Sequence, residues 1–448
     1  MQRFARPGAG PVGVPGIAPA DLRAGFYSDA YFLNAARILE RSARSQRVFN
    51  GHPLALRETI PLSTSFRPGD AEVEMQVFAR RRPRFVAAGV PFALGLLRDG
   101  MRSARRPSRR NPPPAVLAIP EGTLTRPLDP VLVVRGRYRD FAHLETPILG
   151  VLTRCSRIAT HVYEALVASR GKPVLFFPAR FDLPQCQPVD GYAYRVGVRA
   201  FERRTGKRVP VHVSTDAQGA LWKERGGGTV PHAFVLCYLG DTAEALLDFC
   251  RHAPASVKRV ALVDTTNDCV GESVRTARRL FEEHLRLLRA GRAAEASRFV
   301  LHGVRADTSP DLRDRSVPPS RDPRLARGVT PVLITLMRRA LDRAPAELGL
   351  AGRWRRVAER YFRGVKITAT GGFDSRKIRF FEARRAPVDM YGVGSHFLRG
   401  ESNDFTADVV RVRIGGRFRL AAKTGRAPRA NPDLRPVRLR RTGRRRNR

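Results

Sequence analysis

The 448-residue sequence has few cysteines and no apolar run long enough to cross a membrane. Its five cysteines are widely spaced without a Cys-x-x-Cys pair, which argues against a disulfide framework or zinc knuckle, so we expect reduced core thiols. The longest nearly uncharged apolar run, residues 85–97, is broken by Gly89 and Pro91, whereas a spanning helix needs about 20 residues. Residues 1–20 lack the apolar core of a signal peptide. We therefore expect a cytoplasmic protein without a membrane partner.

Acidic residues are scarce relative to basic ones, 41 against 82, which gives a formal net charge of +41. Residues 80–110 hold ten arginines against one acid, and residues 423–448 hold eleven basic residues against one acid. Such runs attract polyanions. The C-terminal run nevertheless has no aromatic residue for base stacking, and a compositional preference for arginine explains it equally well. Nucleic-acid binding through this tail is therefore an alternative that the sequence does not favour.

The pattern of apolar residues changes near Glu145. Before it, a helix at residues 29–42 and alternating strands at 72–78 and 115–138 indicate a mixed α+β module. After it, buried strands alternate with amphipathic helices, which is typical of a β/α barrel. The sequence thus predicts four regions: a flexible N-terminus at 1–20, a mixed α+β domain at 21–144, a barrel domain at 145–400, and a basic, partly disordered tail at 401–448.

Two glycine turns follow the last two predicted strands of the barrel. Val365 to Asp374 reads as a β-branched strand ending in Thr-Gly-Gly, and Val388 to Ser395 reads as a strand ending in Gly-Val-Gly-Ser. Glycines let backbone N–H groups approach an anion closely, and barrels commonly bind phosphate where these two loops meet. The sequence therefore predicts an α/β protein with an irregular β/α barrel that binds a phosphorylated substrate.

Charged residues stand at the ends of several predicted strands. Arg180 suits a carboxylate or phosphate, Asp264 and Asp307 suit ribose hydroxyls or Mg²⁺, and His232 suits a general base or phosphoryl acceptor. Each has a structural alternative. His232 could be a loop histidine with satisfied hydrogen bonds, the two aspartates could be helix N-caps, and Arg305 could form a structural pair with Asp307. For Asp374, an N-cap role is the favoured reading.

The order and spacing of these segments resemble the nicotinate phosphoribosyltransferase family from about residue 25 to residue 397. Eight stretches carry the resemblance: Tyr27-Ser-Asp-Ala-Tyr-Phe-Leu33, Glu145-Thr-Pro-Ile-Leu-Gly150, Ser156-Arg-Ile-Ala-Thr160, Gly228-Thr-Val-Pro-His232, Ala261-Leu-Val-Asp-Thr-Thr-Asn-Asp268, Gly303-Val-Arg-Ala-Asp-Thr-Ser309, Thr370-Gly-Gly-Phe-Asp374 and Val388-Asp-Met-Tyr-Gly-Val-Gly-Ser395. The resemblance implies a type II phosphoribosyltransferase fold. It also implies that nicotinate and phosphoribosyl pyrophosphate give nicotinate mononucleotide and pyrophosphate in NAD synthesis, with ATP as co-substrate, Mg²⁺ bound through the phosphates, and a homodimer.

The resemblance also implies roles for individual residues. His232 would be phosphorylated from ATP, and Asp264 and Asp307 would stabilise an oxocarbenium-like transition state. The nicotinate pocket would contain Tyr31, Thr229 and Arg305. The phosphoribosyl substrate would contact Arg180 and the two glycine turns, namely Thr370, Gly371, Gly372, Gly392, Gly394 and Ser395.

Two motifs depart from the family pattern. Phe181 and Asp182 follow Arg180 where the family often has a second basic residue and a histidine, and the histidine block reads Pro-His-Ala instead of Ala-His-Ser. The first departure keeps open a transferase for another base. A non-catalytic, nucleic-acid-associated protein that uses the basic tail is the alternative from a different class. Residues 80–110 and 401–448 lie outside the resemblance and receive no role.

Overall fold

The computed structural model describes most of the chain as two compact units. The described residues are 11–49, 56, 66–80, 84–102, 113–228, 230–400 and 403–439. The first unit, here called the sheet unit, is drawn from residues 1–163, 185–200 and 399–448. The second, here called the barrel unit, is drawn from residues 164–184 and 201–398. Each unit is described by itself.

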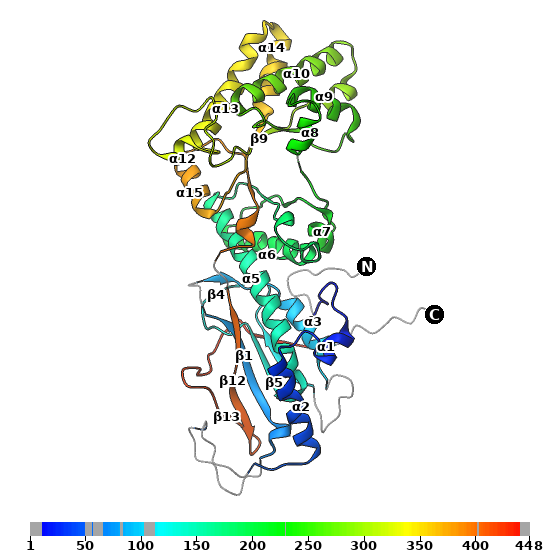
Figure 1. Cartoon of the computed structure of the whole chain (residues 1–448), viewed down its shortest axis with the longest axis vertical. Helices are drawn as coiled ribbons and strands as arrows, with labels where there is room; N and C mark the ends of the chain where they lie inside the picture. Colours follow the sequence, from blue (N-terminus) through cyan, green and yellow to red (C-terminus); the bar gives the residue numbers. More distant parts are fainter. Residues whose placement is uncertain are drawn as a thin grey trace, which may run out of the picture. The chain divides into compact units, whose positions relative to one another are not determined.

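A six-stranded antiparallel sheet with helices on one face forms the sheet unit (Figure 1). Its strands run in the order β13-β12-β1-β5-β3-β14, with bounds β1 (Glu72–Ala79), β3 (Ala115–Ala118), β5 (Leu132–Arg137), β12 (Phe405–Ile414), β13 (Arg417–Leu420) and β14 (Arg435–Val437). A separate pair joins β2 (Phe85–Val86) to β4 (Leu124–Thr125). The helices are α1 (Pro19–Ala24), α2 (Ala30–Arg44), α3 (Val90–Gly100), α4 (Tyr138–Phe141) and the first part of α5 (Glu145–Ala168).

Alternating apolar residues on β1 explain how this sheet forms its core. Val73, Met75 and Val77 point to one face, where they belong to the same buried cluster as Leu97 of α3 and Leu152 of α5. Burying such side chains contributes about 1.5–3 kcal/mol each. The predicted helix at 29–42, the strand at 72–78 and the antiparallel strands within 115–138 all occur.

The two ends of the chain differ from the predicted domain division. Residues 405–437, expected as a tail, contribute three strands to the sheet, and β12 pairs with β1 from Val73↔Val412 to Ala79↔Phe405. Phe405, Ala407 and Val409 alternate along the first half of β12 and pack on the core cluster. A register shift between Glu74 and Met75 then interrupts the alternation, and Arg411 and Arg413 beyond it pair with Glu74 and Glu72. At the other end, the Val12 amide donates to the Pro91 carbonyl, so residues 11–20 are packed against α3. Residues 1–10 and 440–448 lie outside the described part.

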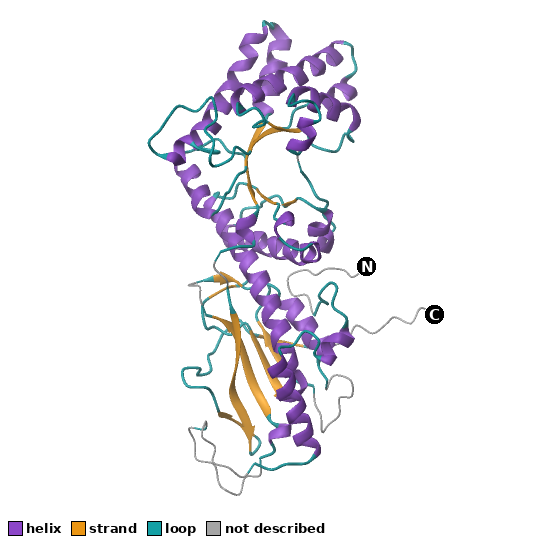
Figure 2. Ribbon diagram, viewed as in Figure 1, coloured by secondary structure: helices purple, strands orange, loops and turns teal. Residues whose placement is uncertain are grey.

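An open parallel barrel forms the second unit (Figure 2). Its six strands run in the order β7-β6-β11-β10-β9-β8, with bounds β6 (Val174–Phe176), β7 (His212–Val213), β8 (Val260–Leu262), β9 (Gly303–Ala306), β10 (Lys366–Ala369) and β11 (Met390–Val393). Because β11 pairs with β6, the sheet wraps round until β7 and β8 stand at its two edges. Within the described residues no ladder joins those edges, which makes the predicted barrel an open one.

Helices surround the outside of this curved sheet, as Figure 2 shows. Their bounds, together with α6, which the two units share, are α6 (Gln187–Thr205), α7 (Asp216–Gly219), α8 (His232–Leu236), α9 (Thr242–His252), α10 (Cys269–Arg289), α11 (Ala293–Ala296), α12 (Pro323–Ala326), α13 (Pro331–Arg343), α14 (Gly352–Gly364) and α15 (Ser375–Ala383). The amphipathic helices expected between the barrel strands include α10, in which Ala277, Phe281 and Leu285 are buried. None of the described helices is long and apolar enough to cross a membrane.

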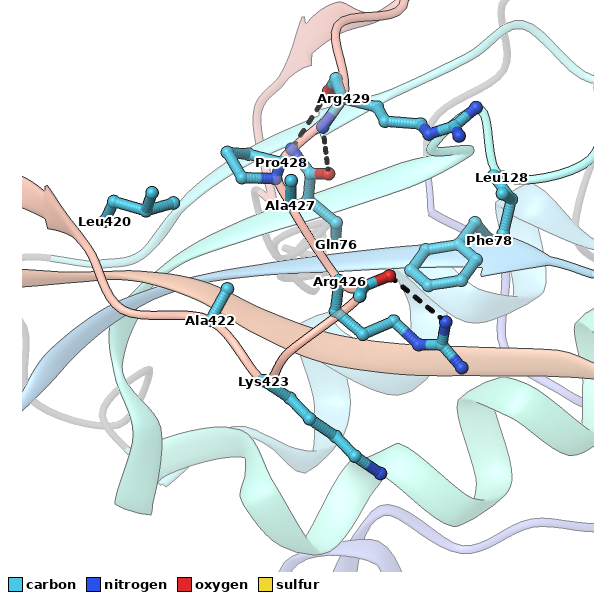
Figure 3. A pocket seen from close by; sticks show the side chains of 11 residues that line it. Gln76, Phe78, Leu128, Leu420, Ala422, Lys423, Arg426, Ala427, Pro428 and Arg429 are labelled. Atoms are coloured by element: carbon cyan, nitrogen blue, oxygen red, sulfur yellow. Dashed lines mark hydrogen bonds between the residues drawn. The ribbon is translucent and has the colours of Figure 1, made fainter. Parts of the chain in front are cut away.

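A pocket of about 400 Å³ lies in the sheet unit on the face opposite the core (Figure 3). There the C-terminal segment crosses β1, and the Gln76 amide group donates to the Arg429 carbonyl at 3.1 Å and accepts from the Arg429 amide at 3.0 Å. Arg426 at the rim pairs with Asp408 at 3.1 Å. The pocket contains none of the predicted site residues. The shape of the pocket follows from the two hydrogen bonds by which Gln76 holds the C-terminal segment across β1.

Candidate active site

The carboxyl ends of the barrel strands bring most of the predicted site residues to one edge of the sheet. Asp264 follows β8, Arg305 lies on β9, Thr370 follows β10, Ser395 follows β11 and Arg180 follows β6. Neighbouring strands β8, β9, β10, β11 and β6 are all paired in parallel. Their C-terminal ends therefore form one continuous rim, the usual position of an active site in this architecture.

Asp264 and His232 form a pair at this rim. His232 Nε2 lies 3.0 Å from Asp264 Oδ2, and the side chains are 42% and 9% exposed. Burial raises the pKa of the Asp264 carboxyl, and the neighbouring His232 partly opposes that shift. His232 begins α8, which directs its ring towards the end of β8. The pair leaves the His232 Nδ1 atom without a hydrogen-bond partner among the described residues.

Three oxygen atoms beside this pair are buried without a hydrogen bond in the described part. They are Asp264 Oδ1, Thr265 Oγ1 and Asn267 Oδ1. Buried polar atoms are nearly always satisfied by protein or by bound molecules, and an unmade hydrogen bond costs about 1–3 kcal/mol. Of the three, Asp264 Oδ1 belongs to the pair with His232 at the end of β8, so it is the candidate acceptor for a ligand that donates a hydrogen bond or carries positive charge.

Each carboxylate oxygen of Asp307, by contrast, accepts one hydrogen bond. Arg305 Nη2 donates to Asp307 Oδ2 at 2.6 Å, and Thr370 Oγ1 donates to Asp307 Oδ1 at 2.7 Å. Thr370 is fully buried. The structural pairing of Arg305 with Asp307 is thus present, and Thr370 ties the end of β10 to the end of β9.

Neither Asp264 nor Asp307 is a helix N-cap, the structural alternative that the sequence left open for both. Asp268, not Asp264, caps α10 by accepting from the Gly271 amide. Asp374 caps α15, as predicted, by accepting from the Lys377 amide at 2.7 Å. No helix in the described part begins directly after Asp307. Asp264 therefore remains available to a ligand.

The first glycine turn has the conformation that its sequence predicts. Gly371 and Gly372 have φ angles of +94° and +65°. Residues with a Cβ rarely adopt positive φ angles. The amides of Gly371, Gly372 and Phe373 donate to no acceptor within the described chain. Consecutive free amides ahead of a helix form a concavity that suits an anion.

The second glycine turn needs its glycines for close packing. A Cβ on Gly392 would lie 2.5 Å from Thr370 Cγ2 and 2.7 Å from the Phe177 ring, and one on Gly394 would lie 2.8 Å from the Phe181 ring. Such distances require atoms to move. The partly exposed Ser395 begins a short 3₁₀ helix just beyond them. Gly392 therefore lets β11 approach Thr370 at the start of the first turn, and Gly394 lets the second turn approach the segment that follows β6.

Three predicted site residues are not seen in contact with the other rim residues. Arg180 is exposed, and its guanidinium lies 5.3 Å from the Phe181 ring centroid, with no described carboxylate beside it. Tyr31 belongs to the sheet unit, where it is 64% exposed and donates to Asp29 at 3.4 Å. Thr229 lies outside the described residues.

Sequence reasoning missed three residues at the rim. Thr265 and Asn267 stand in the same strand-end run as Asp264, but only the tertiary structure shows that their oxygens lack partners. Lys377 was also missed, although it follows the Asp374 cap by three positions and therefore lies on the first turn of α15. Its Nζ atom donates to the Gly371 carbonyl at 2.8 Å.

No group of three or more histidine, cysteine, aspartate or glutamate side chains is placed to hold a metal ion in the described part of the chain. All five cysteines fall in that part and are free thiols, of which Cys155, Cys250 and Cys269 are buried and Cys237 is exposed. A magnesium ion at this rim would therefore need ligands from a substrate, with the orphaned Asp264 oxygen as the candidate protein ligand.

Comparison with known proteins agrees with this geometry. Residues 59–156 match the model of the quinolinate phosphoribosyl transferase N-terminal domain. A nicotinate phosphoribosyltransferase of Mycobacterium tuberculosis is 25% identical over 288 residues, which cover 63% of this chain and 48% of that protein. The solved nicotinate-nucleotide pyrophosphorylase of Pyrococcus furiosus is 27% identical, with a TM-score of 0.63, and the match covers 95% of this chain and 82% of that one.

The chain is therefore similar to nicotinate and quinolinate phosphoribosyltransferases. The fold is that of the type II phosphoribosyltransferases, as the parallel open barrel and the Pyrococcus structure both indicate. The chain spans about half the length of the curated relatives that it matches.

Proposed function

We propose that this protein transfers the phosphoribosyl group of phosphoribosyl pyrophosphate to nicotinate, in NAD synthesis. One observation carries the proposal. The Gly371–Gly372 turn and the Asp264 oxygen that lacks a hydrogen bond both lie at the carboxyl ends of strands of the same parallel sheet. The turn suits a 5′-phosphate, and the Asp264 oxygen suits donors such as ribose hydroxyls. The matched nicotinate phosphoribosyltransferase supports nicotinate as the first choice of base.

Asp264 is the preferred carboxylate for the transition state. When the bond to pyrophosphate breaks, positive charge develops on the ribose ring, and a buried carboxylate nearby stabilises it. Asp307 was expected to share this task, but Arg305 and Thr370 already donate to its oxygens. We assign Asp307 the task of joining the β9 and β10 loops. Mg²⁺ would bind the pyrophosphate oxygens and screen the charge of the leaving group.

ATP coupling through His232 is the second element of the proposal. With Nε2 held by Asp264, the Nδ1 lone pair is the free nucleophile, since a neutral imidazole carries its proton on only one nitrogen. Nδ1 would attack the terminal phosphorus of ATP, and ADP would leave with the electrons of the broken P–O bond. The 42% exposure of the ring allows such access.

Quinolinate is the second candidate base. It is favoured by the match of residues 59–156 to the quinolinate phosphoribosyl transferase model. Quinolinate carries two adjacent carboxylates and needs more positive charge than nicotinate. Arg180 is exposed and has no described carboxylate partner, whereas Arg305 is neutralised by Asp307. Arg305 is the one arginine predicted for the base pocket, because Arg180 is assigned to the phosphoribosyl substrate, and a single arginine fits a base with one carboxylate better.

Product formation tests the proposal directly. The full chain is incubated with phosphoribosyl pyrophosphate, Mg²⁺ and either nicotinate, quinolinate or nicotinamide, with and without ATP, and the mononucleotide is measured by chromatography. We expect nicotinate mononucleotide, formed faster with ATP. Product from quinolinate alone would replace the proposed base. No product from any pyridine would contradict the proposed function and leave the fold unchanged.

Labelled ATP tests the histidine separately. The protein should acquire an acid-labile label that H232N loses, while H252N, altered at an exposed histidine on α9, keeps it. Equal labelling of H232N would exclude this residue. A homodimer, which the family resemblance implies, is tested by sedimentation of the intact chain, and a monomer across the working concentration range would exclude it.

A further inference from the structure

Lys377 is a charged residue at the barrel rim that the proposed chemistry does not yet use. It lies in the first turn of α15, directly after the glycine turn. Its Nζ donates to the Gly371 carbonyl oxygen at 2.8 Å and lies 4.5 Å from the centroid of the Phe373 ring. An ammonium group has three N–H donors, and no second acceptor for them is present among the described residues.

The contact with Gly371 fixes the orientation of a peptide plane. A trans peptide is planar, so the Gly371 carbonyl and the Gly372 N–H point in opposite directions. With the carbonyl held by Lys377, the Gly372 amide faces away from the lysine contact. Gly372 is exposed, and a Cβ built on it would meet nothing within 4 Å. The fixed amide therefore belongs to an open part of the rim.

Two consecutive glycines make this peptide flexible, so its orientation must be held by an interaction such as the Lys377 hydrogen bond. Gly371 and Gly372 both have positive φ, and glycine reaches many other conformations at little cost. A rotated Gly371–Gly372 peptide would present its carbonyl oxygen, instead of its N–H, to an approaching phosphate. Holding the carbonyl in the ligand-free protein removes that alternative before the substrate binds.

We propose that Lys377 is a positioning residue that locks the Gly371–Gly372 peptide with its N–H towards the phosphate, while its charge favours the bound anion. This inference rests on the proposed function only in taking a phosphate as the ligand of the turn. It does not depend on which base is transferred. Lys377 contributes to phosphate affinity, with no part in base recognition.

The charge of Lys377 gives the proposal a pH signature. Burial lowers the pKa of its ammonium to about 8, against the opposing attraction of Asp374 at the start of α15 and of Asp307 at the end of β9. A bound phosphate dianion favours the protonated amine. Phosphate affinity should therefore fall as the pH rises through about 8. An arginine at this position stays charged at all working pH values.

Calorimetric titration with phosphoribosyl pyrophosphate and Mg²⁺, and with inorganic phosphate, tests the proposal at pH 7 and pH 9. For the wild-type protein we expect weaker binding of both probes at pH 9. K377M should bind both about tenfold more weakly at pH 7, in line with the loss of a charged hydrogen bond. K377R should restore much of the affinity and remove the change between pH 7 and pH 9.

The matched control is K366M, which removes an exposed lysine of β10 that pairs with Asp389, and it should bind both probes as wild type does. Unchanged affinity in K377M would overturn the proposal and leave the proposed function standing. Nicotinate is titrated as a third ligand, and an equal loss of nicotinate and phosphate affinity in K377M would also overturn the proposal, because it would show general damage to the rim. A wild-type protein that binds neither probe would contradict the phosphoribosyl transfer itself. Thermal unfolding of each variant separates these outcomes from misfolding.

Discussion

Each unit of this protein buries a carboxylate, but the surroundings of the two carboxylates differ. In the sheet unit, the Glu74 side chain is 2% exposed and accepts from Arg135 at 2.7 Å, from Arg411 and from Gln76. In the barrel unit, Asp264 is 9% exposed and has one partner, His232, for one of its two oxygens. A buried charge with complete hydrogen bonding serves the fold. A buried carboxylate whose hydrogen bonding is incomplete is available to a ligand.

The same contrast separates the two aspartates of the barrel rim. Asp307 is satisfied by Arg305 and Thr370, and Asp264 is not. Sequence position alone gives both residues the same role, since each follows a buried strand. The hydrogen bonds of the folded chain give the two aspartates different roles. The following variants test this distinction, beginning with the largest expected effect.

D264N should reduce the rate of phosphoribosyl transfer by about 10²–10³-fold, because it removes the negative charge that faces the developing cation. Its stability should change little, since the side chain keeps its size and one hydrogen bond. Steady-state kinetics and urea unfolding measure the two effects. D268N is the matched control in the same loop. Because asparagine caps a helix about as well as aspartate does, it should change stability by less than about 0.5 kcal/mol, with little loss of rate. Similar rates for both variants would remove Asp264 from the proposed site.

E74A should produce the opposite result, a loss of stability without a specific effect on catalysis. Removing this carboxylate leaves Arg135 and Arg411 without their shared partner, and we expect a loss of about 2–4 kcal/mol in urea unfolding. E72A on the same strand should cost less than about 1 kcal/mol, because Glu72 pairs with the more exposed Arg413. A stability loss in E74A no larger than that in E72A would contradict the assignment.

G392A tests whether the second glycine turn is required for close approach. The added methyl group would meet Thr370 and the Phe177 ring, and we expect a loss of about 1–3 kcal/mol from overpacking. Because Thr370 precedes the first turn directly, phosphate binding should weaken as well. G364A, at the end of α14, adds a methyl group with nothing within 4 Å and should leave both properties unchanged. Wild-type phosphate affinity in G392A would show that the two turns are not coupled.

E145Q should give the smallest effect, and one that depends on pH. Burial and the neighbouring carboxylates of Asp408 and Asp29 raise the pKa of Glu145 to about 8 in the folded protein. The folded state therefore binds this proton more strongly than the unfolded state does, and stability falls as the pH rises from about 4.5 to about 8.

At pH 9, E145Q should consequently be more stable than the wild type by about 1–2 kcal/mol, and at pH 4 the two should be nearly equal. Urea unfolding at both values measures the difference. If the stabilisation of E145Q were the same at both pH values, Glu145 would not be the titrating group.

Much of the candidate site could be predicted from the sequence because it is local. Strands that end in Asp264, Asp307 and the Thr370–Gly372 turn are short apolar runs followed by polar residues, and parallel pairing places such ends at one edge. The Asp374 cap depends only on the next three residues. The C-terminal strands were missed because the charge of residues 401–448 conceals the alternation in β12, whose partner β1 lies more than 300 positions earlier.

The sequence by itself determined the parallel and antiparallel elements, the glycine conformations and the residue types at the barrel rim, since these follow from short-range pattern and backbone sterics. The tertiary structure decided which of two aspartates keeps a free oxygen, which glycine turn serves packing, and where the Lys377 ammonium is held. These outcomes depend on hydrogen bonds and contacts between segments distant in the chain. A buried polar group is assigned its role by the partners that folding brings to it, and those partners cannot be read from its sequence neighbours.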